Sequence, residues 1–266
     1  MVEVDWTILL FGAAFAGWVD AIVGGGGLIL VPLLMMFGPA VAPGFQPVNA
    51  LATNKLAAVW GTGSAAITLV RKVRPEPRLV VLLAAVAGIG SAFGALLATL
   101  MSSDMLRPAV IVLLVAVGIF VAFTPSFGTT GDDSLPLTWR MVALAALATT
   151  AIGTYDGFFG PGTGTFLILA LTAILGRTFL MASTLAKVAN TATNLGALIV
   201  FALGGHVLWL LGLALAMANI AGAQIGARMV IGRGAGFVRI VLLAVVVVMA
   251  AKLSWDQWGD ALVGFF

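Results

Sequence analysis

The chain has 266 residues, of which 62% are hydrophobic and only 9% charged, with a formal net charge of +3. A soluble domain carries about 25% charged residues, so this composition excludes an ordinary water-exposed globular protein. The absence of cysteine excludes disulfides, thiolate metal sites and thiol catalysis. Because several apolar stretches reach the roughly 20 residues that a membrane helix needs, the sequence predicts an all-α polytopic membrane protein.

Apolar segments follow one another along the chain, and one polar stretch divides them. The segments cover residues 6–37, 48–70, 79–101, 107–123, 139–175, 179–203, 207–227 and 238–258. The polar stretch at 124–138 separates an N-terminal transmembrane repeat (1–123) from a C-terminal transmembrane repeat (139–266) as a linker loop. We expect a multi-pass protein of the bacterial inner (plasma) membrane.

The first segment of each half is too long for one straight span. Residues 6–37 would form a helix of about 48 Å, against a hydrocarbon core of about 30 Å. Four glycines (24–27) interrupt this segment, and Gly160-Pro-Gly-Thr-Gly164 interrupts 139–175. Both patterns break helices, because glycine costs backbone entropy and proline lacks a donor. We expect a hairpin of two shorter helices in each half, giving about four to five transmembrane elements per half.

The two halves repeat the same pattern. Residues 17–26 align with 153–162 at an offset of 136, and residues 50–55 align with 182–187 at an offset of 132. The loop at 71–78 is rich in Lys and Arg and should face the cytoplasm, whereas the equivalent loop at 203–206 has neither and should face outside. Equivalent loops on opposite sides predict two inverted repeats, an architecture common among transporters.

Helices that begin at the glycine breaks would direct free N–H groups and the positive ends of their dipoles at one place. Such helix starts favour anions. An alternative is that the glycines only allow helices to pack closely in lipid. The residues that we expect to contribute backbone groups are Gly25, Gly26, Gly27, Gly162, Thr163 and Gly164.

Two lysines lie inside apolar segments, at equivalent positions of the two halves. Lys55 and Lys187 each lie about eight residues, or ~12 Å, into a predicted helix. A charge at that depth is costly and usually functional. The alternative is a lysine that extends along its helix toward the membrane surface. Recurrence at equivalent positions favours function.

Polar residues accompany both lysines: Thr53, Asn54, Asn190 and Asn194. Asn190 and Asn194 follow Lys187 by three and seven residues, which places all three on one helical face. These side chains would either donate hydrogen bonds to an oxyanion or bond neighbouring helices to each other.

An aspartate precedes each glycine break by four residues. Asp20 and Asp156 would carry protons, balance the lysines, or cap the broken helix ends. Tyr155 adjoins Asp156 and is expected to line the same cavity. The sequence contains no metal-ligand cluster, phosphate loop or hydrolytic triad, so we expect no metal, no cofactor, no nucleic-acid partner and no enzymatic activity.

These motifs resemble the TauE/SafE family of sulfite and organosulfonate exporters. The resemblance rests on GWVDAIVGGGGLILVPLL (17–34) and NALATNKLAAVWGT (49–62), and on GTYDGFFGPGTGTFLI (153–168) and ASTLAKVANTATN (182–194). It implies a secondary transporter that exports small sulfur-containing anions such as sulfite, sulfoacetate or other organosulfonates, coupled to a proton or other ion gradient. Ala186 occupies the position equivalent to Asn54, so the two halves of the site differ.

Together these features predict alternating access at an anion site near the bilayer midplane, in which the lysines balance the charge of the anion. An alternative is an anion channel, or a carrier for other small oxyanions or carboxylates. The partners expected are therefore a small anion, the lipid bilayer and a coupling proton or ion.

Overall fold

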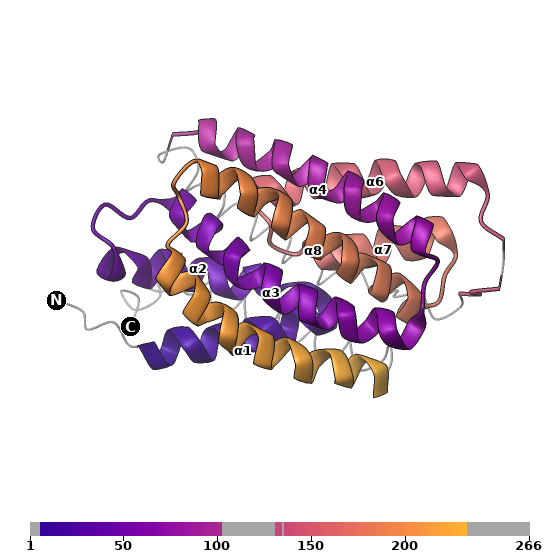
Figure 1. The fold of residues 1–266 in the computed structure, drawn as a ribbon, viewed down its shortest axis with the longest axis horizontal. Helices are drawn as coiled ribbons and strands as arrows, with labels where there is room; N and C mark the ends of the chain where they lie inside the picture. The colour runs from indigo at the N-terminus through magenta and orange to yellow at the C-terminus, as the bar shows by residue number, and fades with distance from the viewer. Residues whose placement is uncertain (1–5, 103–130, 135, 233–266) are drawn as a thin grey trace, which may run out of the picture.

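A computed structural model of the chain describes residues 6–102, 131–134 and 136–232, and this part is helical (Figure 1). Five of its helices are long and apolar enough to cross a membrane. The prediction of a polytopic helical membrane protein is confirmed. The predicted spans 107–123 and 238–258 lie outside the described residues. The helices are α1 (Trp6–Val23), α2 (Gly26–Val41), α3 (Pro47–Val73), α4 (Pro77–Leu100), α6 (Trp139–Phe158), α7 (Thr163–Leu175), α8 (Phe179–Leu203) and a further helix, Trp209–Gly232.

Helix α3 is the longest of the labelled helices and is less apolar than the five spans. It begins at Pro47, which needs no amide partner, and Gln46 and Asn49 cap its start with reciprocal hydrogen bonds. It ends at Val73, and the left-handed backbone of the next residue, Arg74 (φ 55°), stops the helix. Its polar residues at 53–55 are buried, so α3 carries its polar groups into the interior of the protein.

Both long segments are broken, as predicted, and each forms a hairpin. Glycines with φ of +80° and +92°, at positions 24 and 160, end the first helix of each hairpin in a conformation that other residues avoid. In the second hairpin the amide of Asp132, seven residues before α6, donates to the carbonyl of Gly176, the residue after α7. In the first hairpin Leu9 of α1 packs in one cluster with Leu34 of α2. The outer ends of each hairpin therefore lie together.

The tips of the two hairpins meet inside the bundle. The amide of Gly164 donates to the carbonyl of Gly24 at 3.1 Å, and the hydroxyl of Thr165 donates to the carbonyl of Val23 at 2.8 Å. A methyl group added at Gly24 would lie 2.2 Å from the Cα of Gly164. With 16 and 13 residues, α2 and α7 are about 24 and 20 Å long, too short to cross a membrane alone. That the tips touch could not be predicted from the sequence alone.

Each half packs against the other through glycines. Methyl groups added at Gly90 and Gly94 of α4 would clash with the backbone of Thr150 and Thr154 of α6. Figure 1 shows these two helices side by side. Methyl groups added at Gly222 and Gly226 would clash in the same way with the backbone of α1, at Ala14 and Trp18.

The second interface is related to the first by the offsets of the sequence repeat, 132 residues for the glycines and 136 for their partners. In both interfaces the residue numbers rise in the same direction, so α4 runs parallel to α6 and Trp209–Gly232 runs parallel to α1. These contacts support the predicted inverted repeat. That arrangement stays a prediction, because the last segment of each half lies outside the described residues.

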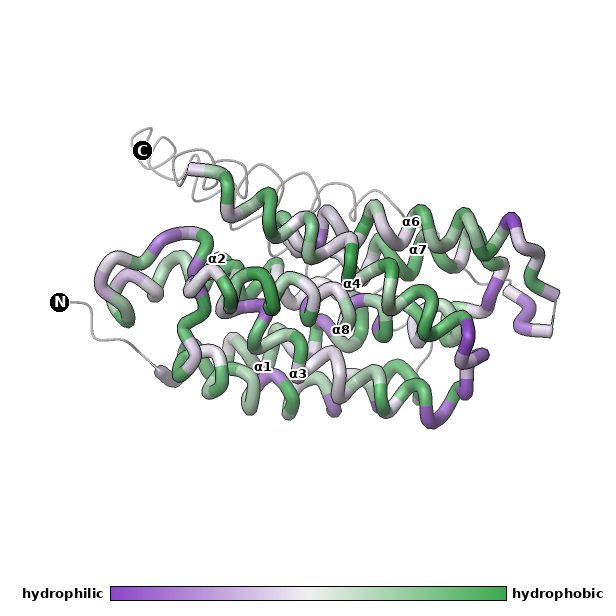
Figure 2. The backbone as a smooth tube through the Cα atoms, turned by 45° about the horizontal axis from the view of Figure 1, so that its top comes forward, coloured by the Kyte–Doolittle hydropathy of each residue, from purple (hydrophilic) through white to green (hydrophobic). Residues whose placement is uncertain are grey.

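The charged residues of the described part, apart from four buried ones, gather at one end of the bundle, which we call the basic end. It comprises the α3–α4 connection, the start of α6, the α7–α8 connection and the end of Trp209–Gly232. Figure 2 shows purple, hydrophilic residues at the α3–α4 connection and green, hydrophobic residues along much of the helices. The residues are Arg71, Lys72, Arg74, Glu76, Arg78, Asp132, Asp133, Arg140, Arg177 and Arg228. The described end of the linker, residues 131–134 and 136–138, therefore lies at the basic end.

We expect the basic end to face the cytoplasm, since Lys and Arg are enriched in cytoplasmic loops. The chain has no cysteine, so single cysteines can be placed without removing others. In whole cells an impermeant maleimide should label Pro43→Cys, in the exposed α2–α3 loop, and should label Glu76→Cys only after the membrane is opened. Labelling of the two positions in the reverse order would invert the assigned orientation.

Candidate functional site

Two ion pairs cross between the halves where the hairpin tips meet. Lys55 of α3 contacts Asp156 of α6, with Nζ 2.6 Å from Oδ2, and Lys187 of α8 contacts Asp20 of α1, with Nζ 3.2 Å from Oδ2. Each lysine thus pairs with the aspartate of the opposite half. Of the three roles expected for the aspartates, balancing the charge of a lysine is the one that both Asp20 and Asp156 have in this structure.

Both lysines are enclosed by protein, each with only 2% of its surface exposed. A lysine that extended toward the membrane surface would show its ammonium group at the edge of the bundle, and neither does. Taking such charges out of water costs several kcal/mol per ion, and the cost is offset only by close partners and further hydrogen bonds. The ion pairs therefore neutralise the lysines in this state, and a bound anion would have to compete with the carboxylates.

The two pairs differ in how firmly their aspartates are held. Asp20 contacts Lys187 through both its carboxylate and its backbone carbonyl, and its Oδ1 accepts a hydrogen bond from the amide of Gly26 at 3.3 Å. Asp20 therefore also caps the start of α2, as one hypothesis stated. Within the described part of the chain, the carboxylate of Asp156 accepts one hydrogen bond, from the ammonium group of Lys55. Only the Asp156 carboxylate is free to change partner without uncapping a helix.

Only 4% of Asn54 is exposed, and its side-chain amide makes no hydrogen bond within the described residues. A methyl group added at Gly27, in the first turn of α2, would lie 3.6 Å from Nδ2 of Asn54 and 3.7 Å from the Cα of Pro161. A polar side chain inside the bundle that makes no hydrogen bond to the protein is available to a ligand. Asn54 therefore stands at the start of α2 with its hydrogen-bonding capacity unused.

The predicted backbone donors are not equivalent. Helix α2 begins at Gly26, with Gly25 before it, and the amide of Gly27 has no acceptor among the described residues. In the second hairpin Gly162 precedes α7, and the amides of Thr163 and Gly164 already donate to carbonyls of Gly160 and Gly24.

Lys55 ends beside the same tip, because a methyl group at Gly160 would lie 3.0 Å from its Nζ. Gly27 lies beside Pro161 of this tip and Lys55 Nζ beside Gly160. We call Lys55 Nζ, the Asn54 amide and the Gly27 amide, which lie around these two neighbouring residues, the Lys55 donor cluster.

Several predicted residues lie elsewhere or have other contacts. The hydroxyl of Thr53 accepts a hydrogen bond from the amide of Leu208 at 3.2 Å, which anchors the loop after α8. On α8 the amide of Asn194 donates to the carbonyl of Asn190, so the bonds recorded for this pair stay within the helix rather than joining helices. Tyr155 donates from its hydroxyl to the carbonyl of Pro161 at 2.6 Å and so braces the second tip.

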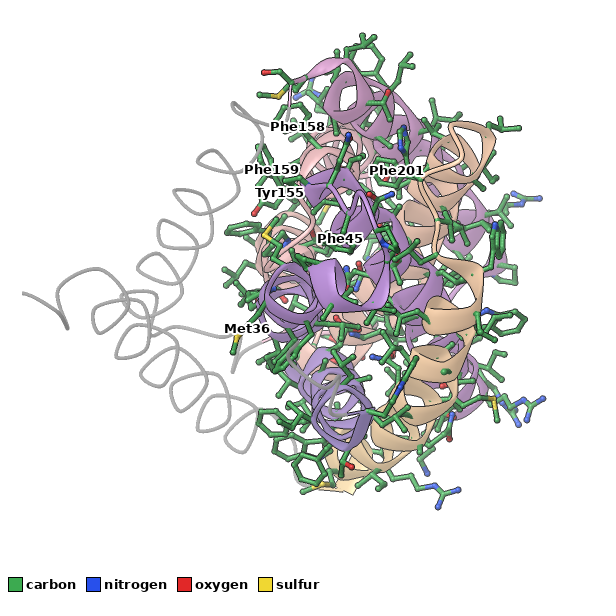
Figure 3. The ribbon with its side chains drawn as sticks, turned by 90° about the vertical axis from the view of Figure 1, so that its left-hand side faces the viewer. Met36, Phe45, Tyr155, Phe158, Phe159 and Phe201 are labelled. Carbon is green, nitrogen blue, oxygen red and sulfur yellow. The ribbon has the colours of Figure 1, made fainter. Side chains whose placement is uncertain are left out.

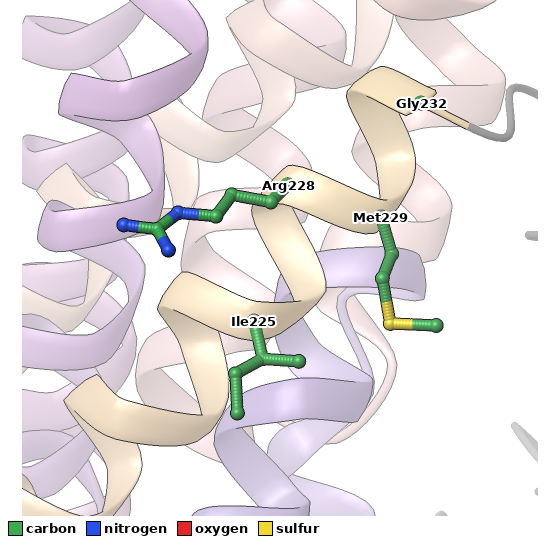
Figure 4. A pocket seen from close by; sticks show the side chains of 4 residues that line it. All are labelled: Ile225, Arg228, Met229 and Gly232. Atoms are coloured by element: carbon green, nitrogen blue, oxygen red, sulfur yellow. The ribbon is translucent and has the colours of Figure 1, made fainter.

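Tyr155 also packs edge-on against Phe166, and Figure 3 shows it grouped with Phe158 and Phe159. These contacts make it a support of the second tip. A shallow hollow lined by Ile225, Arg228, Met229 and Gly232 belongs to a single helix near the basic end (Figure 4), and none of the paired residues lines it.

Sequence reasoning missed Thr165 and three buried hydroxyls that have no partner in the described residues, those of Thr149, Thr172 and Ser183. Thr149 and Asp156 are seven residues apart on α6, and Ser183 and Lys187 are four apart on α8, so each pair shares a helical face. A difference between the two halves could have drawn attention to these four residues. The first half has apolar residues at all four equivalent positions: Ala13, Ile29, Met36 and Leu51.

Comparison with known proteins agrees with the motifs. The model of the family described as "Sulfite exporter TauE/SafE" matches residues 9–253. A protein of Escherichia coli strain K12 named "Probable membrane transporter protein YfcA" is 36% identical over 258 residues, covering 96% of this chain and 92% of the relative. A "Probable membrane transporter protein" of Haemophilus influenzae is 36% identical over 257 residues, covering 96% and 97%. No solved structure gives a significant match.

Proposed function

Because the chain belongs to the TauE/SafE sulfite exporter family, we propose that this membrane transporter is a secondary carrier that exports small sulfur-containing anions, such as sulfite, sulfoacetate or other organosulfonates. The observation that carries the proposal is the Lys55 donor cluster: an amide that bonds to nothing in the described protein, a helix start and an ammonium group lie around the second hairpin tip. Sulfonate and sulfite oxygens suit such a set, since charge-assisted hydrogen bonds are the strong ones.

Alternating access would follow from the two hairpins. The outer ends of each hairpin lie together, the tips touch, and the ion pairs join α3 to α6 and α8 to α1. Rocking of one half against the other would expose the tips first to one side and then to the other, as in other carriers built from inverted repeats. The bacterial inner membrane is the proposed location, with the basic end inside.

Flux into proteoliposomes tests the carrier against a channel. Purified protein should take up radiolabelled 2-hydroxyethanesulfonate with saturation, and unlabelled anion inside the vesicles should accelerate uptake. A channel would show neither saturation nor this acceleration. If the protein moved neither sulfite nor any of the sulfonates tested, the proposed function would be refuted.

Asn54 provides a prediction that separates binding from folding. Asn54→Ala should weaken sulfonate binding by roughly tenfold to a hundredfold, the worth of one hydrogen bond to a charged group. The melting temperature should not fall, because the amide bonds to nothing in the described protein. The matched control is Asn219→Ala, which removes a buried amide that donates to the carbonyl of Ala13 at 3.0 Å. The control should lower stability and leave affinity nearly unchanged. If calorimetry shows that Asn54→Ala binds the sulfonate as tightly as the wild-type protein, Asn54 is not part of the binding site.

A further inference from the structure

The charges at the hairpin tips cancel, and this balance limits what can cross the membrane with the anion. Two ammonium groups face two carboxylates. Helices α2 and α7 contribute no Asp, Glu, Lys, Arg or His, and the phenol of Tyr155 is bonded to Pro161. The other charged residues of the described helices lie at the basic end: Arg71, Lys72, Arg78, Arg140 and Arg228. An anion that entered alone would therefore leave a net negative charge buried among apolar helices.

We propose that each monovalent anion is carried together with one proton, and that Asp156 is the group that takes the proton. The inference rests on the proposed function and specifies its coupling. When the anion accepts the hydrogen bonds of the Lys55 ammonium, the carboxylate of Asp156 loses its partner and accepts a proton from the same side of the membrane. On the opposite side the proton leaves, the anion departs, and the pair re-forms.

The structure distinguishes Asp156 from its counterpart Asp20. Asp20 caps α2 and contacts Lys187 twice, so releasing it would undo the tip of the first hairpin. Asp156 accepts a single hydrogen bond from the described residues. The donor is Lys55, the lysine that follows Asn54 in the chain. The second half has no equivalent of that asparagine, because Ala186 stands in its place.

Three buried hydroxyl groups distinguish the second half of the chain from the first. Thr149, Thr172 and Ser183 have no hydrogen-bond partner in the described residues, and each lies between the hairpin tips and the basic end on its own helix. The equivalent residues of the first half are Ala13, Met36 and Leu51, which cannot exchange hydrogen bonds with water or a proton. Of these hydroxyl groups, that of Thr149 lies on the same helix as Asp156, seven residues before it.

The coupling of anion to proton follows from the net charge of the site in each of its loaded forms. The empty site and the site with one anion and one proton carry no net charge, whereas the anion alone or the proton alone leaves one buried charge uncompensated. Because buried uncompensated charge is costly, only the two neutral forms should change sides readily. Transport of a monovalent sulfonate should then be electroneutral, sensitive to the pH difference and to the anion gradient but not to the membrane potential. In a cell that is more alkaline inside, export would run down the outward anion gradient and against the pH difference.

Asp156→Asn mimics the protonated carboxylate permanently. In proteoliposomes the variant should still exchange labelled for unlabelled 2-hydroxyethanesulfonate, since its anion-loaded form is neutral. Net uptake driven by a pH difference should fall by at least about tenfold, because the empty form now carries an unpaired Lys55 charge and cannot return. Asp20→Asn should instead lower exchange and net uptake together, with a lower melting temperature. Glu76→Gln, at the exposed basic end, is the control and should change none of these.

A measurement on the unaltered protein accompanies the variants. An internal pH dye should report about one proton for each 2-hydroxyethanesulfonate, with no change of rate when a potassium diffusion potential is imposed. Anion flux without proton movement, or a rate that follows the potential, would overturn the coupling while leaving the carrier intact. Proton-driven net uptake that persists in Asp156→Asn would overturn the assignment to Asp156. Failure of the wild-type protein to move any sulfonate would instead refute the proposed function.

Discussion

Lys55→Met should abolish sulfonate transport and lower the free energy of unfolding by about 3–5 kcal/mol. The structure places the ammonium 2.6 Å from Asp156, with both side chains 2% exposed, so its removal leaves a buried carboxylate without its partner. Loss of transport alone would not separate a binding role from a folding role. Thermal unfolding in detergent and flux in proteoliposomes should therefore be measured on the same preparations.

The double variant Lys55→Met with Asp156→Leu makes that separation. Replacing both members of a buried ion pair with apolar residues is often neutral or stabilising, so the melting temperature should return close to the wild-type value. Transport should stay absent, because the ammonium that would hold the anion is missing. Lys72→Met, at the exposed end of α3, should behave as wild type in both assays. Recovery of transport in the double variant would show that Lys55 serves only to neutralise Asp156.

Gly164→Ala should lower stability by about 1–3 kcal/mol or more and abolish transport, because the two hairpin tips cross at this residue. A methyl group there would lie 2.3 Å from the Cα of Gly24, and both partners are backbone atoms that no side-chain rotation can move aside. The same shift would strain the hydrogen bond from the Gly164 amide to the Gly24 carbonyl.

A matched glycine controls for the general effect of adding a methyl group. Gly63 lies inside α3, where the nearest atom to an added methyl is Cγ2 of Thr191 at 3.5 Å, an ordinary van der Waals contact. Gly63→Ala should keep or slightly raise the melting temperature, since alanine favours helix over glycine. A Gly164→Ala protein that melts and transports as wild type would contradict the close crossing of the tips.

The breaks in the helices could be predicted from the sequence, but their contacts could not. Consecutive glycines, or Gly-Pro-Gly, break a helix locally, so positions 24–27 and 160–164 already indicated two hairpins. The structure then shows that α2 begins within the glycine run, at Gly26, and that the two tips touch. Contact between segments 140 residues apart depends on the packing of the whole bundle, and a single sequence holds no record of it.

The candidate site was predictable in its composition and less so in its pairing. The repeat identified Lys55, Lys187, Asp20 and Asp156 as buried charges, because equivalent positions of both halves carry them. The repeat did not indicate that each lysine would pair with the aspartate of the other half, because both aspartates lie at a depth that either lysine could reach. Thr53 was expected near the anion from its place beside Asn54, yet a residue one position along a helix points about 100° away and contacts Leu208 instead.

The central claim, that an oxyanion binds at the Lys55 donor cluster, can be tested directly by locating a heavy analogue. Selenite keeps the pyramidal shape of sulfite and scatters X-rays anomalously, so crystals of the protein grown with it would place the selenium atom. We expect the peak within hydrogen-bonding reach of Lys55, Asn54 and the amide of Gly27, with Asp156 displaced from the lysine. A peak at the arginines of the basic end, with the Lys55–Asp156 pair intact, would contradict the account.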